Sequence, residues 1–197
     1  MKKPAKIMTI RREDQRRAFA SPQRMEIIGL FMERKPLSVA DIAERMGRPA
    51  SAIHYHVRVM EKAGILRRAG ERRDGRRPEA LYVPVAEMFQ MEQKQNDEAA
   101  SKDVLKTMSV AFRMALSDMK AALTNPKVKT DGPHRNTFGA RVHCRLSMKD
   151  LAELNRHLMA IQKLAFRVQK NHKPSKNDSF VSLTVALMPL RNREVQP

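Results

Sequence analysis

Two histidines lie two residues apart in the stretch SAIHYHVRVMEKAGIL, which runs from Ser51 to Leu66. Imidazole side chains such as those of His54 and His56 can bind a metal ion or transfer protons. Tyr55 and Arg58 beside them are residue types that bind nucleic acids. Apolar residues recur through this stretch at the spacing of an amphipathic helix. The faces of that helix therefore decide which chemistry these side chains can perform.

The helix separates the two histidines. If Ile53, Val57 and Met60 form the buried stripe, His54 and His56 lie about 200° apart around the helix axis. Metal-binding pairs on one helix are instead spaced three or four residues apart. Partners for a nucleophile or a general base are also missing at suitable spacings, and the motifs of phosphate-binding loops and zinc hydrolases are absent. We therefore expect no metal ligands, no catalytic residues, no cofactor and no enzyme activity.

The face opposite the buried stripe is polar and cationic. Arginine can pair with guanine in the major groove, which is wide enough to admit a helix, and serine and histidine can donate or accept hydrogen bonds there. A solvated surface would look the same on this helix alone, so the residues that surround it must decide. The face consists of Ser51, Tyr55, Arg58 and Lys62, with His54 on one shoulder and His56 near the core on the other.

Two helix signals precede this stretch. Ser21 can cap a helix that begins with Pro22. In PLSVADIAERMG, Ser38 and Asp41 have the spacing of a capping box, and Gly47 can end the short helix that follows. The turn MGRPA then leads into the helix with the two histidines. Two short helices around a glycine-containing turn are the helix-turn-helix pattern.

A basic hairpin is predicted after the second helix. ILRRAG and ALYVPV read as short strands around the loop ERRDGRRPE, whose Asp-Gly pair favours a hairpin turn. Six arginines face only two acidic residues between positions 67 and 77, a density that suits phosphate contacts or the minor groove. This combination predicts a winged helix-turn-helix. The residues expected to contact DNA are Arg48, Ser51, His54, Tyr55, Arg58, Lys62, Arg72, Arg73, Arg76 and Arg77.

The rest of the chain divides by composition into further segments. Residues 1–17 read as a basic N-terminal arm, 18–86 as the winged helix-turn-helix domain and 87–125 as a helical connector. Residues 136–190 read as a strand-helix-strand domain for dimerisation or effector binding, with Cys144 facing inward. The fold class is mainly α with small β, or α+β. A seam at alternating three- and four-residue spacings could join two subunits: Leu105, Met108, Phe112, Ala115, Met119 and Ala122.

The composition of the chain indicates which classes of binding partner it can have. The 197 residues carry 39 Lys and Arg against 21 Asp and Glu, a net charge of +18, which attracts polyanions. No apolar run approaches the roughly 20 residues that span a bilayer, so we expect no membrane partner. A single cysteine cannot form an internal disulfide, which fits a reducing compartment. We expect a cytoplasmic, nucleoid-associated protein whose partner is double-stranded DNA.

The central segments resemble the ArsR-like winged helix-turn-helix transcriptional regulators of bacteria. The resemblance covers about residues 18–86 and rests on ASPQRMEIIGLF, LSVADIAERMGRPASAIHYHVRVMEKAGIL and GRRPEALYVPV. It implies a DNA-binding homodimer in which Ser51, His54, Tyr55 and Arg58 face DNA. Metal-sensing members carry paired cysteines at the start of the recognition helix, where this chain has Ala50, Ser51 and Ala52.

The leading hypothesis is a homodimeric transcriptional regulator that reads a palindromic site. Two alternatives stay open. The high positive charge also fits a non-specific nucleic-acid-binding or architectural protein. The C-terminal segment could instead make the chain an effector-gated regulator, for which Arg141, His143 and Arg145 could line an anionic site. The sequence identifies no effector molecule.

Overall fold

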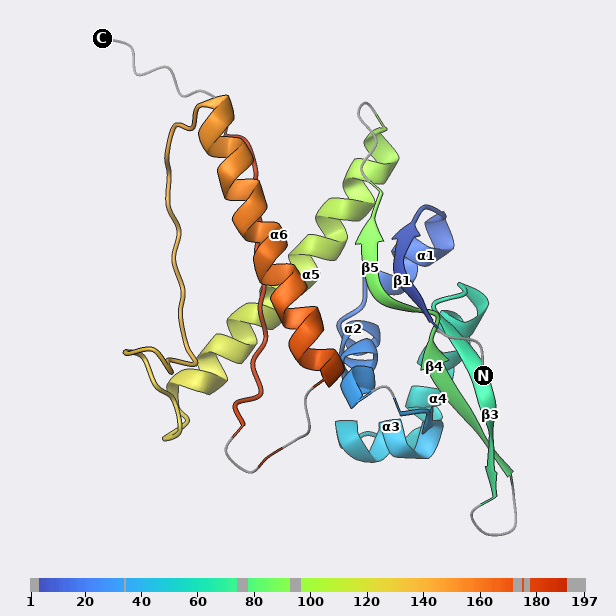
Figure 1. Ribbon diagram of the computed structural model, residues 1–197. Helices are drawn as coiled ribbons and strands as arrows, with labels where there is room; N and C mark the ends of the chain where they lie inside the picture. The colour runs from blue at the N-terminus through green and yellow to red at the C-terminus, as the bar shows by residue number, and fades with distance from the viewer. Residues whose placement is uncertain are drawn as a thin grey trace.

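The computed structural model describes residues 4–33, 35–73, 78–92, 97–171, 175 and 178–190. In Figure 1, short helices and two small sheets form the N-terminal half, and two long helices dominate the C-terminal half. The described part of the chain is therefore α+β, as predicted.

The helix-turn-helix forms from the predicted local signals. The Ser38 hydroxyl accepts from the backbone N–H of Asp41 at 3.1 Å, and the Asp41 carboxylate accepts from the backbone N–H of Ser38 at 2.8 Å. Gly47 ends that helix with a left-handed φ of 59°, a conformation that glycine adopts without steric cost. The elements up to the second helix are α2 (Pro22–Gly29), η1 (Leu30–Glu33), β2 (Leu37–Ser38), α3 (Val39–Met46) and α4 (Ala50–Lys62).

The predicted hairpin follows α4. β3 (Leu66–Arg73) pairs antiparallel with β4 (Pro78–Pro84), and β2 adds a third strand on the other side of β4. The register places Arg68 opposite Tyr82 and Arg72 opposite Glu79. The tip of the loop, including the predicted Arg76 and Arg77, lies outside the described residues.

A small aliphatic core holds the helices against the hairpin. Its side chains come from every element between α1 and β4, so α4 is fixed from several directions. Burying a side chain of this kind contributes about 1.5–3 kcal/mol. The most deeply buried members are Ile27, Ile42, Ile53, Val57, Met60, Ile65 and Leu66.

The N-terminal segment is not the basic arm that the sequence predicts. β1 (Ala5–Ile10) pairs in parallel with β5 (Ala86–Met91), and α1 (Glu13–Phe19) packs beside them. The pairing explains a second difference, because residues 87–91 are predicted to start the helical connector but lie in β5. The two strands lie about 80 positions apart in the sequence, and local patterns do not reveal such distant partners.

The helical connector itself is α5 (Glu98–Leu123). Its buried residues are Ala100, Thr107 and Val110, near the end that contacts α1 and α2. Arg16 of α1 forms an ion pair with Asp103 of α5 at 2.8 Å. Two of the six predicted seam residues are exposed in this chain, with 69% of Leu105 and 43% of Phe112 accessible, and the other four are half-buried. The seam therefore has no complete partner within the described part of the monomer.

The C-terminal segment contains the predicted helix but not the predicted strands. α6 (Met148–Asn171) begins after a capping box in which Ser147 and Asp150 bond reciprocally. The segments 137–147 and 178–190 are extended, yet neither forms a strand. Cys144 is exposed rather than inward-facing, because a strand needs a hydrogen-bonded neighbour to define an inner face. None of the described helices is long and apolar enough to cross a membrane.

Candidate nucleic-acid interface

The outer face of α4 is presented to solvent as predicted from its helical spacing. Ile53, Val57 and Met60 are buried, and each is at most 1% accessible. The face opposite them carries hydroxyl, imidazole, guanidinium and ammonium groups, and 63% of Tyr55 is accessible. A rigid helix with such groups outward can be inserted into a major groove without rearranging the core. The exposed residues are Ser51, His54, Tyr55, Arg58 and Lys62, with Arg48 in the preceding turn.

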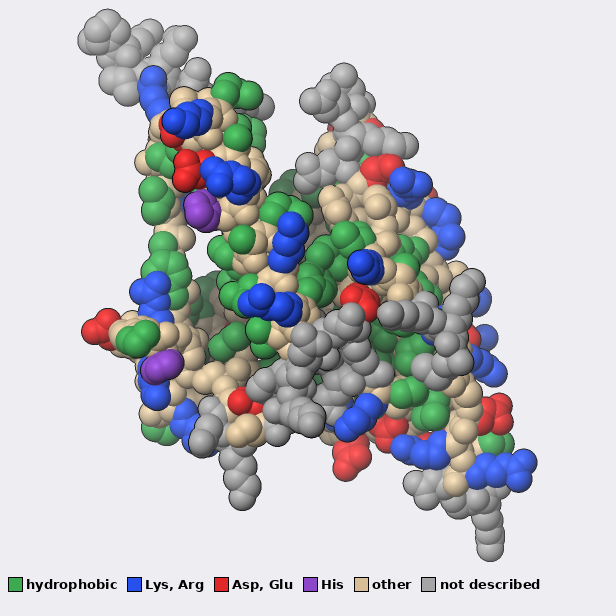
Figure 2. Space-filling view, in the orientation of Figure 1, with side chains coloured by type: hydrophobic (Ala, Val, Ile, Leu, Met, Phe, Trp, Pro, Cys, Tyr) green, Lys and Arg blue, Asp and Glu red, His purple; other side chains and the backbone are tan. Residues whose placement is uncertain are grey.

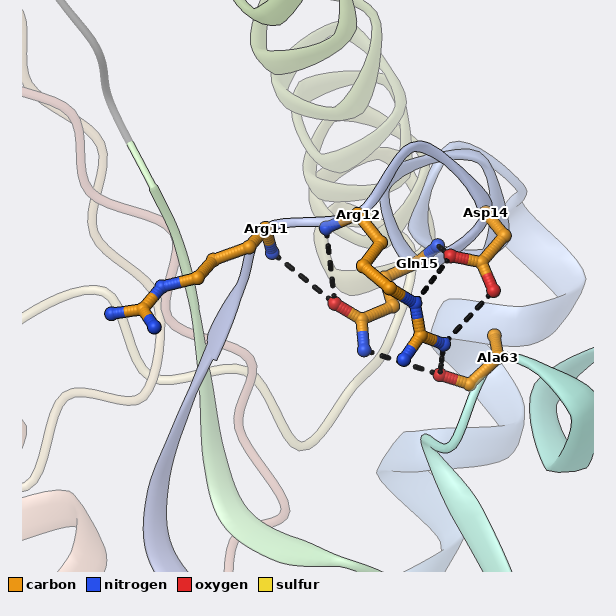
Figure 3. Close-up of polar contacts among 5 residues, drawn as sticks. All are labelled: Arg11, Arg12, Asp14, Gln15 and Ala63. Atoms are coloured by element: carbon orange, nitrogen blue, oxygen red, sulfur yellow. Dashed lines mark hydrogen bonds and ion pairs between the residues drawn. The ribbon is translucent and has the colours of Figure 1, made fainter.

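The N-terminal segment holds the last turn of α4 in place (Figure 3). The carbonyl oxygen of Ala63 accepts from the Arg12 guanidinium at 2.9 Å and from the Gln15 side-chain amide at 3.3 Å. The amide oxygen of Gln15 accepts in turn from the backbone N–H groups of Arg11 and Arg12. Helix C-termini leave carbonyl groups without intrahelical partners and favour nearby cations. These contacts therefore fix the end of α4 relative to α1.

A carboxylate orients the arginine in this contact. Asp14 accepts from the Arg12 Nε at 3.0 Å and from its terminal nitrogen at 2.9 Å. The Arg12 guanidinium thereby holds the pKa of Asp14 below its ordinary value. The carboxylate stays charged at neutral pH and keeps the guanidinium directed at Ala63.

An open hollow of about 340 Å³ lies between α4 and the hairpin. His54, Arg58 and Lys62 line it from the helix, and Arg68 and Tyr82 line it from β3 and β4. Arg68 forms an ion pair with Glu61 at 3.3 Å, and its side chain remains 63% accessible. The predicted site residues omit Arg68 and Tyr82. Arg68 belongs to the arginine-rich stretch between positions 67 and 77, and the register of the hairpin pairs it with Tyr82 beside α4.

Arg72 lies on the hairpin but reaches back to the helix-turn-helix. Its guanidinium bonds to the carboxylate of Asp41 at 3.0 Å and to that of Glu79 at 2.9 Å. Burial raises the pKa of Asp41, but hydrogen bonds from Ser38 and Arg72 outweigh burial and hold it below the ordinary value. Arg72 thus joins β3, β4 and the start of α3. This geometry gives Arg72 a positioning role, while its predicted contact with DNA stays a prediction.

Asp41→Asn should lower the free energy of unfolding at pH 7 by about 1 kcal/mol, since it weakens both a helix cap and an ion pair. A carboxylate with a depressed pKa stabilises the fold above its ordinary pKa of 3.8, and this contribution is lost as the pH falls below it. Urea unfolding measured from pH 7 to pH 3 should therefore show that the free energy of unfolding decreases less in the variant than in the wild type. Glu44→Gln, on an exposed position of α3, should change stability by less than about 0.5 kcal/mol. Identical acid profiles for Asp41→Asn and wild type would contradict the assignment.

His56 occupies the border between the outer face and the core. Its ring packs edge-on against Tyr55, with 5.4 Å between the ring centroids. Burial, and then the positive charges of Arg24 and Arg48, lower its pKa below the ordinary value of 6.5. Arg24 comes from α2, so this helix adds a cation near α4 that the predicted site does not include. His56 is therefore neutral at pH 7.

The ring of His56 should titrate below pH 6.5 in an NMR experiment. Arg48→Gln should raise the titration midpoint because it removes one of the repelling charges. The unfolded chain binds a proton at His56 near pH 6.5, whereas the folded chain binds it only at a lower pH. The free energy of unfolding should therefore decrease as the pH falls below 6.5. A midpoint at or above 6.5 would show that the ring is not held in this environment.

The predicted site residues that the structure describes lie on α4, in the turn before it and on β3. Those of α4 form one outward face, and His54, Arg58 and Lys62 converge on the hollow with Arg68. Arg73 is exposed at the end of β3. Arg76 and Arg77 lie outside the described residues, so their predicted role stays a prediction. Across the described ranges, no group of three or more His, Cys, Asp or Glu side chains is placed to hold a metal ion.

Comparison with known families identifies part of this architecture. A family model described as a helix-turn-helix domain matches residues 19–69. That range runs from the end of α1 through α2, α3 and α4 into β3. No curated protein matches the chain. The chain thus contains a helix-turn-helix domain, which indicates a DNA-binding regulator with DNA as its partner.

Proposed function

We propose that this protein is a sequence-specific transcriptional regulator of the winged helix-turn-helix type, similar to the ArsR-like regulators of bacteria. α4 is its recognition helix, and the β3–β4 hairpin is its wing. One observation carries the proposal: the polar and cationic face of α4 is exposed on a helix whose opposite face is fully buried. The proposed protein binds DNA without catalysing a reaction, and it acts in the cytoplasm near the nucleoid.

The proposed binding unit is a homodimer. Two recognition helices related by a two-fold axis would read half-sites about 10 base pairs apart, so the site should be palindromic. The predicted seam of α5 supports association, because Leu105 and Phe112 stay 69% and 43% accessible in the monomer. Leu116, beside the seam, is 71% accessible.

Selection of bound duplexes from a random pool tests both parts of the proposal. A palindrome with one enriched half-site per recognition helix is expected. Binding to the selected duplex should fall steeply with salt, because Lys and Arg contacts to phosphate release counterions. A pool that stays random after repeated selection at moderate salt would contradict sequence-specific recognition.

A non-specific or architectural DNA-binding protein is the second candidate. The net charge of +18 favours it, since phosphate contacts alone supply non-specific affinity. Footprinting distinguishes the two functions. Protection confined to one site supports the regulator, whereas even protection along unrelated DNA supports the architectural protein.

A further inference from the structure

The C-terminal half of the chain lacks a core of its own. Among the described residues from 111 to 190, none is buried. Figure 2 shows hydrophobic side chains at the surface over α6 and beside it. α6 contributes four exposed apolar side chains in its second half: Met159, Ile161, Leu164 and Val168.

The exposed area is too large for an isolated monomer. The chain exposes 15875 Å², whereas a compact monomer of 22.6 kDa exposes about 9,500 Å². The difference is larger than the roughly 800 Å² that each partner buries in a standard interface, and also larger than the about 1,000–2,500 Å² per partner of most obligate interfaces. A second copy of the chain brings an equal apolar surface, so it can cover part of this area.

Both extended segments have the pattern of strands without strand partners. Among the described residues, no backbone hydrogen bond involves 137–146 or 179–190. Phe138, Val142 and Leu146 alternate with cationic residues in the first segment, and Val181 and Val185 belong to an apolar alternation in the second. Such unpaired edges recruit another strand.

The arrangement around α6 favours pairing of the two segments with each other. Figure 1 shows both running in the direction opposite to α6, so they are parallel to each other. The Asn136 side chain donates to the Ser179 hydroxyl at 3.4 Å, which holds the starts of the segments together. Strand, helix and parallel strand form a βαβ unit. A sheet of only two strands, however, is marginally stable in water.

Charge determines which segment can meet its own copy across a two-fold axis. Residues 179–190 contain no charged side chain, so an antiparallel pair of these segments brings no like charges together. The segment 137–146 carries Arg141, His143 and Arg145, which would oppose the same cations of its copy. Cationic side chains instead suit an edge strand.

From these observations we infer that a second copy of this chain completes a four-stranded sheet. Residues 180–188 of the two protomers pair antiparallel at its centre, 137–146 form its two edges, and the two α6 helices cover one face. The inference rests on the homodimer of the proposed function, not on DNA recognition. It names the C-terminal strands, rather than the α5 seam alone, as the contact between protomers.

Sedimentation velocity of the full chain at micromolar concentration is the first test. The wild type should sediment as a dimer, and Val185→Lys should raise the dimer dissociation constant more than about 100-fold, because it would bury a charge in the sheet. Ser117→Lys, on an exposed position of α5, adds the same charge outside the sheet and should leave the dimer intact. A monomeric wild type, or an unchanged dimer in Val185→Lys, would overturn the inference.

Single cysteines give a second test that does not depend on disrupting the fold. In a Cys144→Ser background, cysteines at positions 182–186 should form an intermolecular disulfide on mild oxidation only at the one or two positions near the axis. The wild-type Cys144, on an edge strand, should stay unlinked. Efficient linkage through Cys144, with none at 182–186, would overturn the sheet order.

Measurements of DNA binding distinguish a failure of this inference from a failure of the proposed function. A monomeric wild type that still selects one DNA sequence refutes the shared sheet and leaves sequence recognition standing. A dimer with the expected disulfides that binds no DNA supports the sheet and refutes the regulator. Val185→Lys should keep its weak binding to random duplexes, which shows that the helix-turn-helix remains folded.

Discussion

Replacement of Arg58 by alanine is expected to weaken binding to the selected duplex by about 10- to 100-fold, the range of one bidentate contact to a base. Arg58 is exposed on α4, opposite Ile53 and Val57 in the core. It also lines the hollow toward the hairpin, where a groove edge would lie. Fluorescence anisotropy with the selected duplex and a scrambled duplex measures the effect. Affinity for the scrambled duplex should change only a fewfold, because Arg58→Ala removes at most one phosphate contact from that complex.

The matched control removes an arginine from another exposed helix. Arg113 lies on α5, away from α4, and donates to the carbonyl of Ser109. Arg113→Ala should leave both affinities unchanged. Equal losses on the selected and scrambled duplexes for Arg58→Ala would show that this residue contacts phosphate rather than bases.

Ile53→Ala should lower the free energy of unfolding by about 2–5 kcal/mol, because it leaves a cavity where the side chain is fully buried. The loss is a large share of the 5–15 kcal/mol that stabilises a typical domain. Urea unfolding followed by circular dichroism measures it. Affinity per folded molecule should stay close to wild type, since Ile53 does not face the proposed groove.

Tyr55→Ala, two residues further along α4, should show the opposite behaviour. Its side chain is 63% accessible, so stability should change by less than about 1 kcal/mol, while affinity for the selected duplex should fall. A larger stability loss for Tyr55→Ala than for Ile53→Ala would reverse the proposed orientation of the helix.

The helix-turn-helix could be predicted because its determinants are local. The capping pair Ser38 and Asp41, the stop at Gly47 and the apolar spacing of α4 all act within one or two helical turns. The orientation of α4 followed from the same spacing, and its buried stripe is confirmed.

The segments whose structure was predicted wrongly depend on partners that are distant in the sequence. β1 and β5 are strands because each pairs with the other, and neither segment shows its partner locally. The segments 137–146 and 180–187 show the alternation of strands, yet the structure gives them no partner among the described residues. Arg72 has the composition of a phosphate contact, but its ion pair with Asp41 spans 31 positions. Local patterns predicted the helices of the helix-turn-helix and the hairpin, whereas long-range contacts decided which of the remaining segments are strands and what Arg72 does.

The contacts at Ala63 also connect two parts of the fold that are distant in the sequence. β1 and α1 lie between two attachments: Glu92 donates its backbone N–H to Ile10 at one end, and Arg12 and Gln15 grip Ala63 at the other. Through these contacts β1 and α1 connect the end of β5 to the C-terminal end of α4. Removing residues 5–19 should therefore leave the final turn of α4 less firmly held, in addition to removing positive charge.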